Sequence, residues 1–199
     1  MEISAIITAI GTIIMGTFGF LQYRFNKKAD FDYEVKRKEI ERQSYRRADN
    51  SAIIIRELYN LLHNLHADRV YIVQPHPLGN EESISIYYEV TRKSVLGMKS
   101  QIQNLNIKSL AVMTGDMAEN LYISITNIDE QIKDRYAKSM FLNNGTEQVY
   151  IKRLSDNRYD WNGSLFVEFT KKVEIDSDMV RTEMHEAASS IQYILPEIR

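Results

Sequence analysis

The segment ADRVYIVQPH, residues 67–76, decides the fold because it joins a helical pattern to a strand. From Arg69 to Pro75 it is rich in β-branched and aromatic residues, which favour a strand. Upstream, residues 51–66 repeat apolar side chains with a period near 3.6, which predicts a helix that buries one face. Downstream, a turn cluster leads to residues 83–91, where apolar and polar side chains alternate. The segment therefore predicts a helix followed by a pair of strands.

The rest of the chain continues to mix helices and strands. Residues 95–120 show no clear period, and short helical turns are expected there. Beyond them the pattern predicts a strand, a helix, two strands and a long amphipathic helix, at residues 121–125, 129–141, 148–154, 164–170 and 176–195. About 150 residues follow the N-terminal segments, which is enough for one domain with a core. An α+β fold is expected.

The order of these elements and three short motifs resemble the GAF domain family. The matching positions are Ala67 to Ile72, then Asn144, Gly145, Val149, Tyr150, Ile151 and Leu154, then Gly163, Leu165, Val167, Glu168 and Phe169. The resemblance covers roughly residues 51–195. It implies an antiparallel sheet with the first and last helices on one face, and a small-molecule pocket on the other face, roofed by the irregular central segment. Because the motifs are mostly the apolar pattern of a sheet, they support the fold more than the function.

Candidate ligand-binding residues are polar side chains and tyrosines in or beside these strands. Glu89 and Glu168 lie in predicted strands with apolar neighbours. Either carboxylate could project into a pocket, or could instead reach water or pair with Arg92 or Lys152. His76 directly follows the first strand. The predicted ligand-binding set is Tyr71, His76, Glu89, Tyr150 and Glu168.

No catalytic or metal site is predicted. The chain has no Cys, which excludes disulfides, thiolate nucleophiles, Cys-ligated zinc and a bilin attached to Cys. His63 and His66 are three residues apart on one predicted helix, but no third metal ligand accompanies them. No G-x-S-x-G elbow, H-E-x-x-H motif or phosphate-binding Gly loop occurs. We therefore expect no enzyme activity, and the identity of any cofactor stays open.

The N-terminal run predicts a membrane anchor. From Ile3 to Tyr23 no side chain is charged, and a helix needs about 20 apolar residues to cross a bilayer. Small residues recur at every fourth position of this run, in a stripe suited to helix pairing: Ser4, Thr8, Thr12 and Gly16. A cleaved signal peptide is disfavoured because no small-x-small cleavage site follows.

Three cations close this run and set its expected orientation. They are Arg24, Lys27 and Lys28, and they are also expected to contact anionic lipid headgroups at the membrane surface. Because positive residues favour the cytoplasmic side, the N-terminus is expected outside and the soluble domain in the cytoplasm. The predicted segments are a transmembrane anchor, a charged helical neck and a GAF-like domain, at residues 1–23, 24–49 and 50–199.

Two functional interpretations follow from this organisation. The formal net charge is −2 and no basic block occurs, so a nucleic-acid partner is not expected. The first interpretation is a membrane-anchored, non-catalytic GAF-like sensor or protein-interaction module, a homo-dimer or oligomer with a possible small-molecule ligand. The alternative is a small membrane-active protein, holin-like or superinfection-blocking as in phages, whose soluble domain regulates oligomerisation.

Overall fold

The computed structural model of the chain describes residues 22, 24–25, 27–28, 33–39, 41, 48–77, 82–155 and 161–196. The chain divides into two units, Met1–Ala48 and Asp49–Arg199. The described residues of the first unit are helical and exposed, and they include Arg24, Lys27 and Lys28. The second unit contains all the strands and the core clusters described below. The predicted segment boundaries stay a prediction.

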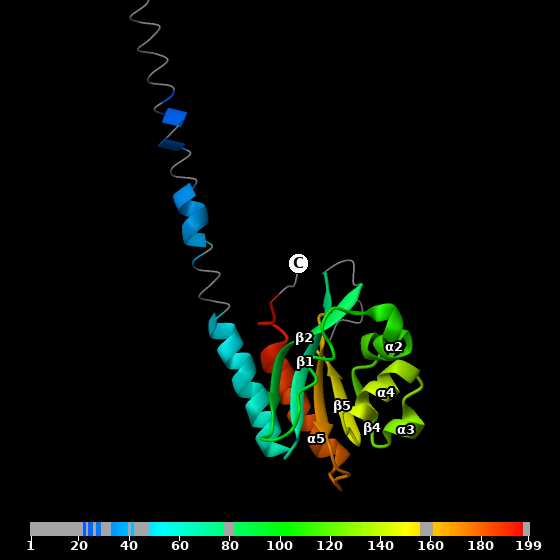
Figure 1. The fold of residues 1–199 in the computed structure, drawn as a ribbon. Helices are drawn as coiled ribbons and strands as arrows, with labels where there is room; N and C mark the ends of the chain where they lie inside the picture. The colour runs from blue at the N-terminus through cyan, green and yellow to red at the C-terminus, as the bar shows by residue number, and fades with distance from the viewer. Residues whose placement is uncertain are drawn as a thin grey trace, which may run out of the picture. The chain divides into compact units, whose positions relative to one another are not determined.

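Six strands of the second unit form one antiparallel sheet in the order β3-β2-β1-β6-β5-β4 (Figure 1). Their bounds are β1 Arg69–His76, β2 Ser83–Thr91, β3 Leu105–Asn106, β4 Tyr122–Ile125, β5 Gln148–Arg153 and β6 Ser164–Phe169. The pairing of β1 with β6 ends where Val73 lies opposite Ser164. Pro75 falls beyond that point, so its missing N–H removes no bond between these central strands.

Helices cover both faces of the sheet (Figure 1). A helix over residues 49–64 and α5, Ser177–Ile191, pack on one face. The other face carries the 3-10 helix Ile107–Leu110 and three short helices, α2 Ala111–Glu119, α3 Ile128–Gln131 and α4 Arg135–Asn143. This arrangement confirms the expected α+β fold with helices on either side of an antiparallel sheet.

The first and last helices share one apolar cluster with the sheet. Their buried side chains recur at helical spacing, as the sequence pattern predicts: Ile54, Leu58 and Leu61 from the first helix, with Leu65 directly after it, and Val180, Met184, Ala187, Ala188 and Ile191 from α5. Asp176 begins α5 as its N-cap, since its carboxylate accepts a hydrogen bond from the N–H of Asp178 at 3.0 Å. The helix ends at Ile191, four residues earlier than predicted.

The helix predicted over residues 129–141 is broken into α3 and α4. Asn127 caps α3 by accepting hydrogen bonds from two N–H groups, and Asp134 caps α4 in the same way. The Asp134 side chain takes main-chain donors that a continuous helix would bond to its own carbonyls, so the chain between α3 and α4, residues 132–134, is extended. The sequence pattern also misses β3, because a strand of two residues shows no alternation.

The structure contradicts the predicted localisation as a single-pass membrane protein. In the part of the chain that the structure describes, no helix is long and apolar enough to cross a membrane. An uncharged run becomes a membrane span only as a continuous helix, which satisfies its own backbone groups in lipid. The predicted anchor lies outside the described residues except for Gln22, and its pairing stripe lies wholly outside them: Ser4, Thr8, Thr12 and Gly16.

Candidate functional site

A pocket of about 210 Å³ opens between α2, β4 and the segment that joins α3 to α4. We call it the β4 pocket. Its floor is apolar, since Ile123 and Ile151 are cross-strand neighbours on β4 and β5, and Ile125 lies beside them. The walls come from α2, from the last residue of α3 and from the joining segment: Val112, Met113 and Asp116, then Gln131, then Ile132, Lys133 and Asp134. The pocket therefore lies on the sheet face that the short helices cover.

Two polar side chains in the wall of the β4 pocket are fixed in place by main-chain hydrogen bonds. The Oε1 atom of Gln131 accepts from the N–H groups of Thr126 and Asn127 at 2.7 and 2.8 Å. Its Nε2 group makes no hydrogen bond to another described residue. The Oδ1 atom of Asp134 accepts from the N–H of Tyr136 at 3.1 Å as the cap of α4. Both side chains are thus held rigidly while keeping some bonding capacity.

The charged groups of the pocket have no ion-pair partner within the described residues. The lining holds two carboxylates, Asp116 and Asp134, and one ammonium group, Lys133. A polar ligand group that donates hydrogen bonds or carries positive charge would suit this surplus of one carboxylate. Pockets for drug-sized ligands usually measure about 300–1,000 Å³, so the β4 pocket suits a smaller ligand or a single side chain of a larger one.

A cluster of polar side chains is buried on the same face of the sheet as the β4 pocket. Arg69 and Glu168 are cross-strand partners on β1 and β6, and they form an ion pair with 3.2 Å between Nε and Oε2. Tyr71 donates a hydrogen bond to Oε1 of Glu168, and Thr146 donates one to Oε2 at 2.8 Å. Tyr71 also stacks on the Phe166 ring. We call Arg69, Tyr71, Thr146 and Glu168 the Arg69 cluster.

The Arg69 cluster also fixes two connecting segments above the sheet. The guanidinium group of Arg69 donates to the carbonyl of Asn144, which directly follows α4, at 2.8 Å. It donates to the carbonyl of Leu96, in the connection after β2, at 3.3 Å. A buried charge needs such partners, because removing it from water without them is costly. The cluster therefore holds the end of α4 in place.

Burial shifts the proton equilibria of this cluster. It raises the pKa of the Glu168 carboxyl, while the charge of Arg69 and the hydrogen bonds from Tyr71 and Thr146 lower it in part. Burial, followed by the neighbouring Glu168 carboxylate, raises the pKa of the Tyr71 hydroxyl well above its usual value. Both pKa values rise because a closed space without water disfavours additional negative charge.

Tyr71 should stay protonated in the folded protein at a pH where exposed tyrosines ionise, near 10. Because its folded pKa is raised, its contribution to stability is present below that pH and is lost as the pH rises further. We expect the native absorbance titration of phenolate near pH 10 to be the same for Tyr71→Phe and the wild type. In urea, where the unfolded chain exposes its tyrosines, the variant should titrate one tyrosine fewer than the wild type. A smaller native titration for Tyr71→Phe would contradict the burial of this hydroxyl.

The structure brings together only some of the predicted ligand-binding residues. Tyr71 and Glu168 meet in the Arg69 cluster, and Glu89 is the register partner of Tyr71 on β2. The Glu89 carboxylate accepts hydrogen bonds from the N–H groups of Met98 and Lys99. It thereby holds the connection that follows β2.

The other two predicted residues lie elsewhere. His76, at the end of β1, makes a hydrogen bond with the hydroxyl of Ser85 at 2.9 Å. Tyr150 belongs to the apolar cluster on the opposite face, where it packs edge-on against Phe169. None of the five lines the β4 pocket. Their role in ligand binding stays a prediction.

Sequence reasoning missed the polar residues of the β4 pocket. Asp116, Gln131, Lys133 and Asp134 belong to no motif and lie in segments read as helical or irregular. One available signal was the capping residue Asp134, which begins a second helix within the predicted one. That break exposes an extended segment, and the segment forms the wall of the pocket.

The sequence matches no protein-family model and no curated protein. The structure, however, resembles solved GAF domains. A GAF3 domain from Synechocystis in its photoproduct state has a TM-score of 0.59 at 10% identity, over 72% of this chain and 90% of that chain. The blue-light absorbing form of the PixJ GAF domain from Thermosynechococcus elongatus has a TM-score of 0.59 at 10% identity, over 74% and 85% of the two chains.

A third solved structure is a phycocyanobilin-bound GAF domain from a cyanobacterial phytochrome. Its TM-score is 0.57 at 13% identity, over 72% of this chain and 82% of that chain. At sequence identities this low, the similarity to these structures shows the fold alone. The second unit therefore has the fold of GAF domains, as the sequence motifs predict.

Proposed function

We propose that the chain is a non-catalytic sensor or interaction module of the GAF-like type, and that its ligand binds in the β4 pocket. The observation that carries the proposal is the pocket itself, in which an apolar floor meets charged groups that have no ion-pair partner among the described residues. A similar fold in a cyanobacterial phytochrome is bound to phycocyanobilin, which supports a ligand-binding role for this architecture. No feature of the described residues favours the alternative of a membrane-active protein.

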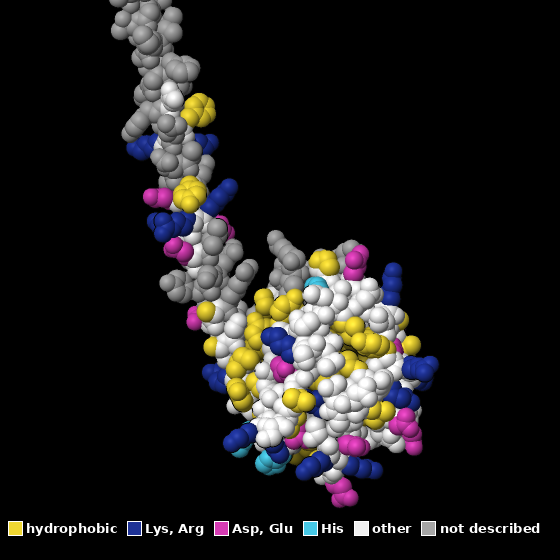
Figure 2. All heavy atoms as spheres, in the orientation of Figure 1, with side chains coloured by type: hydrophobic (Ala, Val, Ile, Leu, Met, Phe, Trp, Pro, Cys, Tyr) yellow, Lys and Arg dark blue, Asp and Glu magenta, His cyan; other side chains and the backbone are white. Residues whose placement is uncertain are grey.

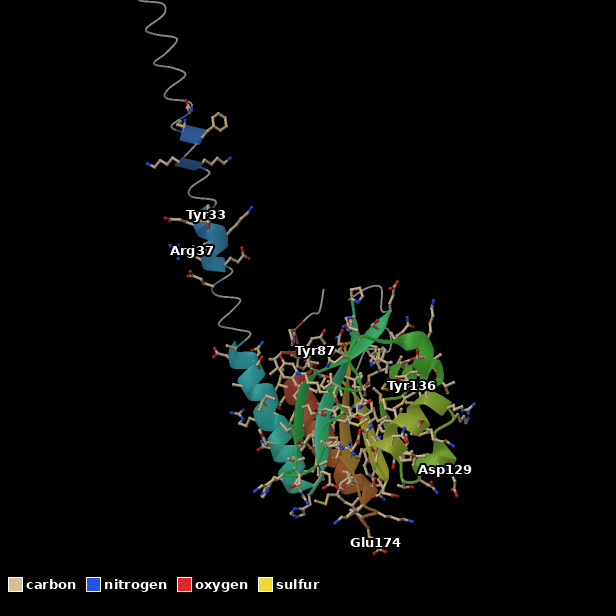
Figure 3. All side chains as sticks on the ribbon, viewed as in Figure 1. Tyr33, Arg37, Tyr87, Asp129, Tyr136 and Glu174 are labelled. Atoms are coloured by element: carbon tan, nitrogen blue, oxygen red, sulfur yellow. The ribbon has the colours of Figure 1, made fainter. Side chains whose placement is uncertain are left out.

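The α3–α4 segment offers a route by which an occupied pocket could be sensed. Gln131 and Asp134 line the pocket, and Asp134 also begins α4. The far end of α4 is bound to Arg69 through the carbonyl of Asn144. Lys138 on α4 pairs with Asp129 on α3, so the two short helices are linked. Asp129 is labelled in Figure 3. A ligand that favours one position of this segment would shift the population of that position.

Filling the pocket should abolish ligand binding without unfolding the protein. Val112 lines the pocket from α2 and is 49% exposed, so Val112→Trp can enlarge the side chain with little strain. Val173 is 37% exposed and does not line the pocket, and Val173→Trp is the matched control. We expect native mass spectrometry and thermal shift with a small-molecule panel to show binding to the wild type and to the control only. Equal binding by Val112→Trp would exclude this pocket as the site.

The homo-dimer predicted from the sequence also remains part of the proposal. Hydrophobic side chains reach the surface beside the 49–64 helix (Figure 2), and Tyr59 and Tyr87 are among the exposed hydrophobic residues. Such side chains favour association when they gather on one surface. Sedimentation velocity over a range of concentrations measures whether the chain self-associates.

A further inference from the structure

Strand β4 is an edge of the sheet, and its outer main chain is unpaired. The sheet order ends at β4, which pairs only with β5. The N–H of Arg153 donates to the carbonyl of Leu121 at 3.1 Å, and these two residues continue the β4–β5 register. Alternate residues of an antiparallel strand face the partner strand. Ile123 and Ile125 therefore face β5, whereas Tyr122 and Ser124 direct their N–H and C=O groups outward.

The next outward donor confirms this geometry. The N–H of Thr126 points away from β5 and is accepted by the side chain of Gln131 at 2.7 Å. In contrast, no hydrogen bond from another described residue reaches the main chain of Tyr122 or Ser124. Two N–H and two C=O groups are thus available at the spacing of a strand.

The β4 pocket borders this edge. Ile123 and Ile125 place their side chains on the face of the sheet that α2 covers, and they form the pocket floor. Side chains alternate along a strand, so the Ser124 side chain lies on the opposite face. Ser124 nonetheless lines the pocket, which means that its main chain, at the edge of the sheet, is what borders the cavity.

We propose that the ligand is an extended peptide segment that adds to the outer edge of β4 and places one apolar side chain in the β4 pocket. This inference rests on the proposed function, since it names the occupant of the same pocket. In this mode of recognition main-chain hydrogen bonds supply affinity, and pockets for alternate side chains supply specificity. The two carboxylates and one lysine of the lining favour a peptide with basic residues next to the apolar one.

The strand pairing also determines which peptide residues bond to β4 and which point into the pocket. In an antiparallel pair, residues that exchange hydrogen bonds point their side chains to the same face. Peptide residues that bond to Tyr122 and Ser124 therefore point away from the pocket. The residue between them lies opposite Ile123 and points into the pocket, as do its neighbours two positions away.

The probe follows this pattern: acetyl-Lys-Ser-X-Ser-Lys-amide, where X is Ile, Leu, Val, Met or Phe. Its control carries N-methyl groups on both Ser residues, so that neither can donate a hydrogen bond to β4. We expect at least one probe to bind the full chain, as measured by isothermal titration calorimetry, and the methylated form of that probe not to bind. On binding, hydrogen exchange at the amides of Tyr122 and Ser124 should slow.

A pair of variants tests the same edge from the protein side. Ser124→Pro removes the outward N–H together with the hydroxyl, and an edge strand tolerates proline where the N–H faces solvent. Ser124→Ala keeps the N–H and removes only the hydroxyl. We expect Ser124→Pro to weaken probe binding about fivefold or more, as for the loss of one hydrogen bond, and Ser124→Ala to bind as the wild type does. Circular dichroism checks that both variants fold.

The outcomes separate this inference from the proposed function. Any of three results would overturn the peptide assignment. The methylated probe could bind as well as its parent, both Ser124 variants could lose probe affinity equally, or none of the five probes could bind. A dimer that Ser124→Pro disrupts would overturn it as well, because a second copy would then occupy the edge. In each case a small molecule that binds the wild type but not Val112→Trp would leave the proposed function standing.

Discussion

Glu168→Ala is expected to lower the free energy of unfolding by about 3–5 kcal/mol, the usual effect of leaving a buried charge without its partner. The side chains of Glu168 and Arg69 are both 0% exposed, so neither can turn to water when the other is lost. Arg69 would retain its carbonyl contacts but lose the charge of Glu168. Urea unfolding followed by circular dichroism measures this loss.

Two further variants make this result interpretable. Glu174 is exposed and points away from the domain (Figure 3), so Glu174→Ala should change the stability by no more than about 0.5 kcal/mol. The double variant Arg69→Met with Glu168→Leu removes both charges and should recover part of the loss. A loss below about 1 kcal/mol for Glu168→Ala would mean that the carboxylate is not enclosed with Arg69.

Phe141→Ala is expected to lower the free energy of unfolding by a similar amount, about 3–5 kcal/mol, because it leaves a cavity under α4. Phe141 is 0% exposed and joins α4 to the apolar cluster on the pocket face of the sheet. Its carbonyl also accepts a hydrogen bond from the N–H of Thr146 at 2.9 Å, which places Thr146 beside the Arg69 cluster. The same unfolding measurement applies.

The neighbouring residue supplies the control for this prediction. Leu142 lies in the same helix but is 46% exposed, so Leu142→Ala should cost much less than Phe141→Ala. Phe141→Leu keeps most of the buried volume and should lose less than Phe141→Ala. Equal losses for Phe141→Ala and Leu142→Ala would contradict the packing of α4 on the sheet.

The layers of this fold could be predicted from the sequence because local periodicity encodes them. The helix that contains Ile54 and Leu58 and the strand that contains Ile84 and Ile86 each show one clear period. Strand β5 shows the limit of this method. All of its residues are buried, so its pattern does not reveal which face carries the pocket. For that reason Tyr150 could not be assigned to the face that carries the first helix and α5, whereas Val149 and Ile151 lie on the pocket face.

The site depends on long-range pairing, which local patterns do not encode. The sequence offers Arg92 and Lys152 as partners for the two strand glutamates, yet Glu168 pairs with Arg69. That choice is made by the register between β1 and β6, which are joined by no short turn. The pocket likewise depends on how β4 meets α2 and the α3–α4 segment, three separate parts of the chain.

The Arg69 cluster has a consequence for the order of folding. The Tyr71 hydroxyl and the Glu168 carboxylate are 97 residues apart in the chain, and Asp68 binds Thr170 across 102 residues. Contacts between residues so far apart in the sequence form late, because a long loop must be ordered before they form. During synthesis Arg69 emerges long before its counter-charge, and the Arg69 cluster, which binds the end of α4, cannot be complete until β6 arrives. The pocket face should therefore not become rigid before β6 is made, and a chain interrupted before β6 should not complete it.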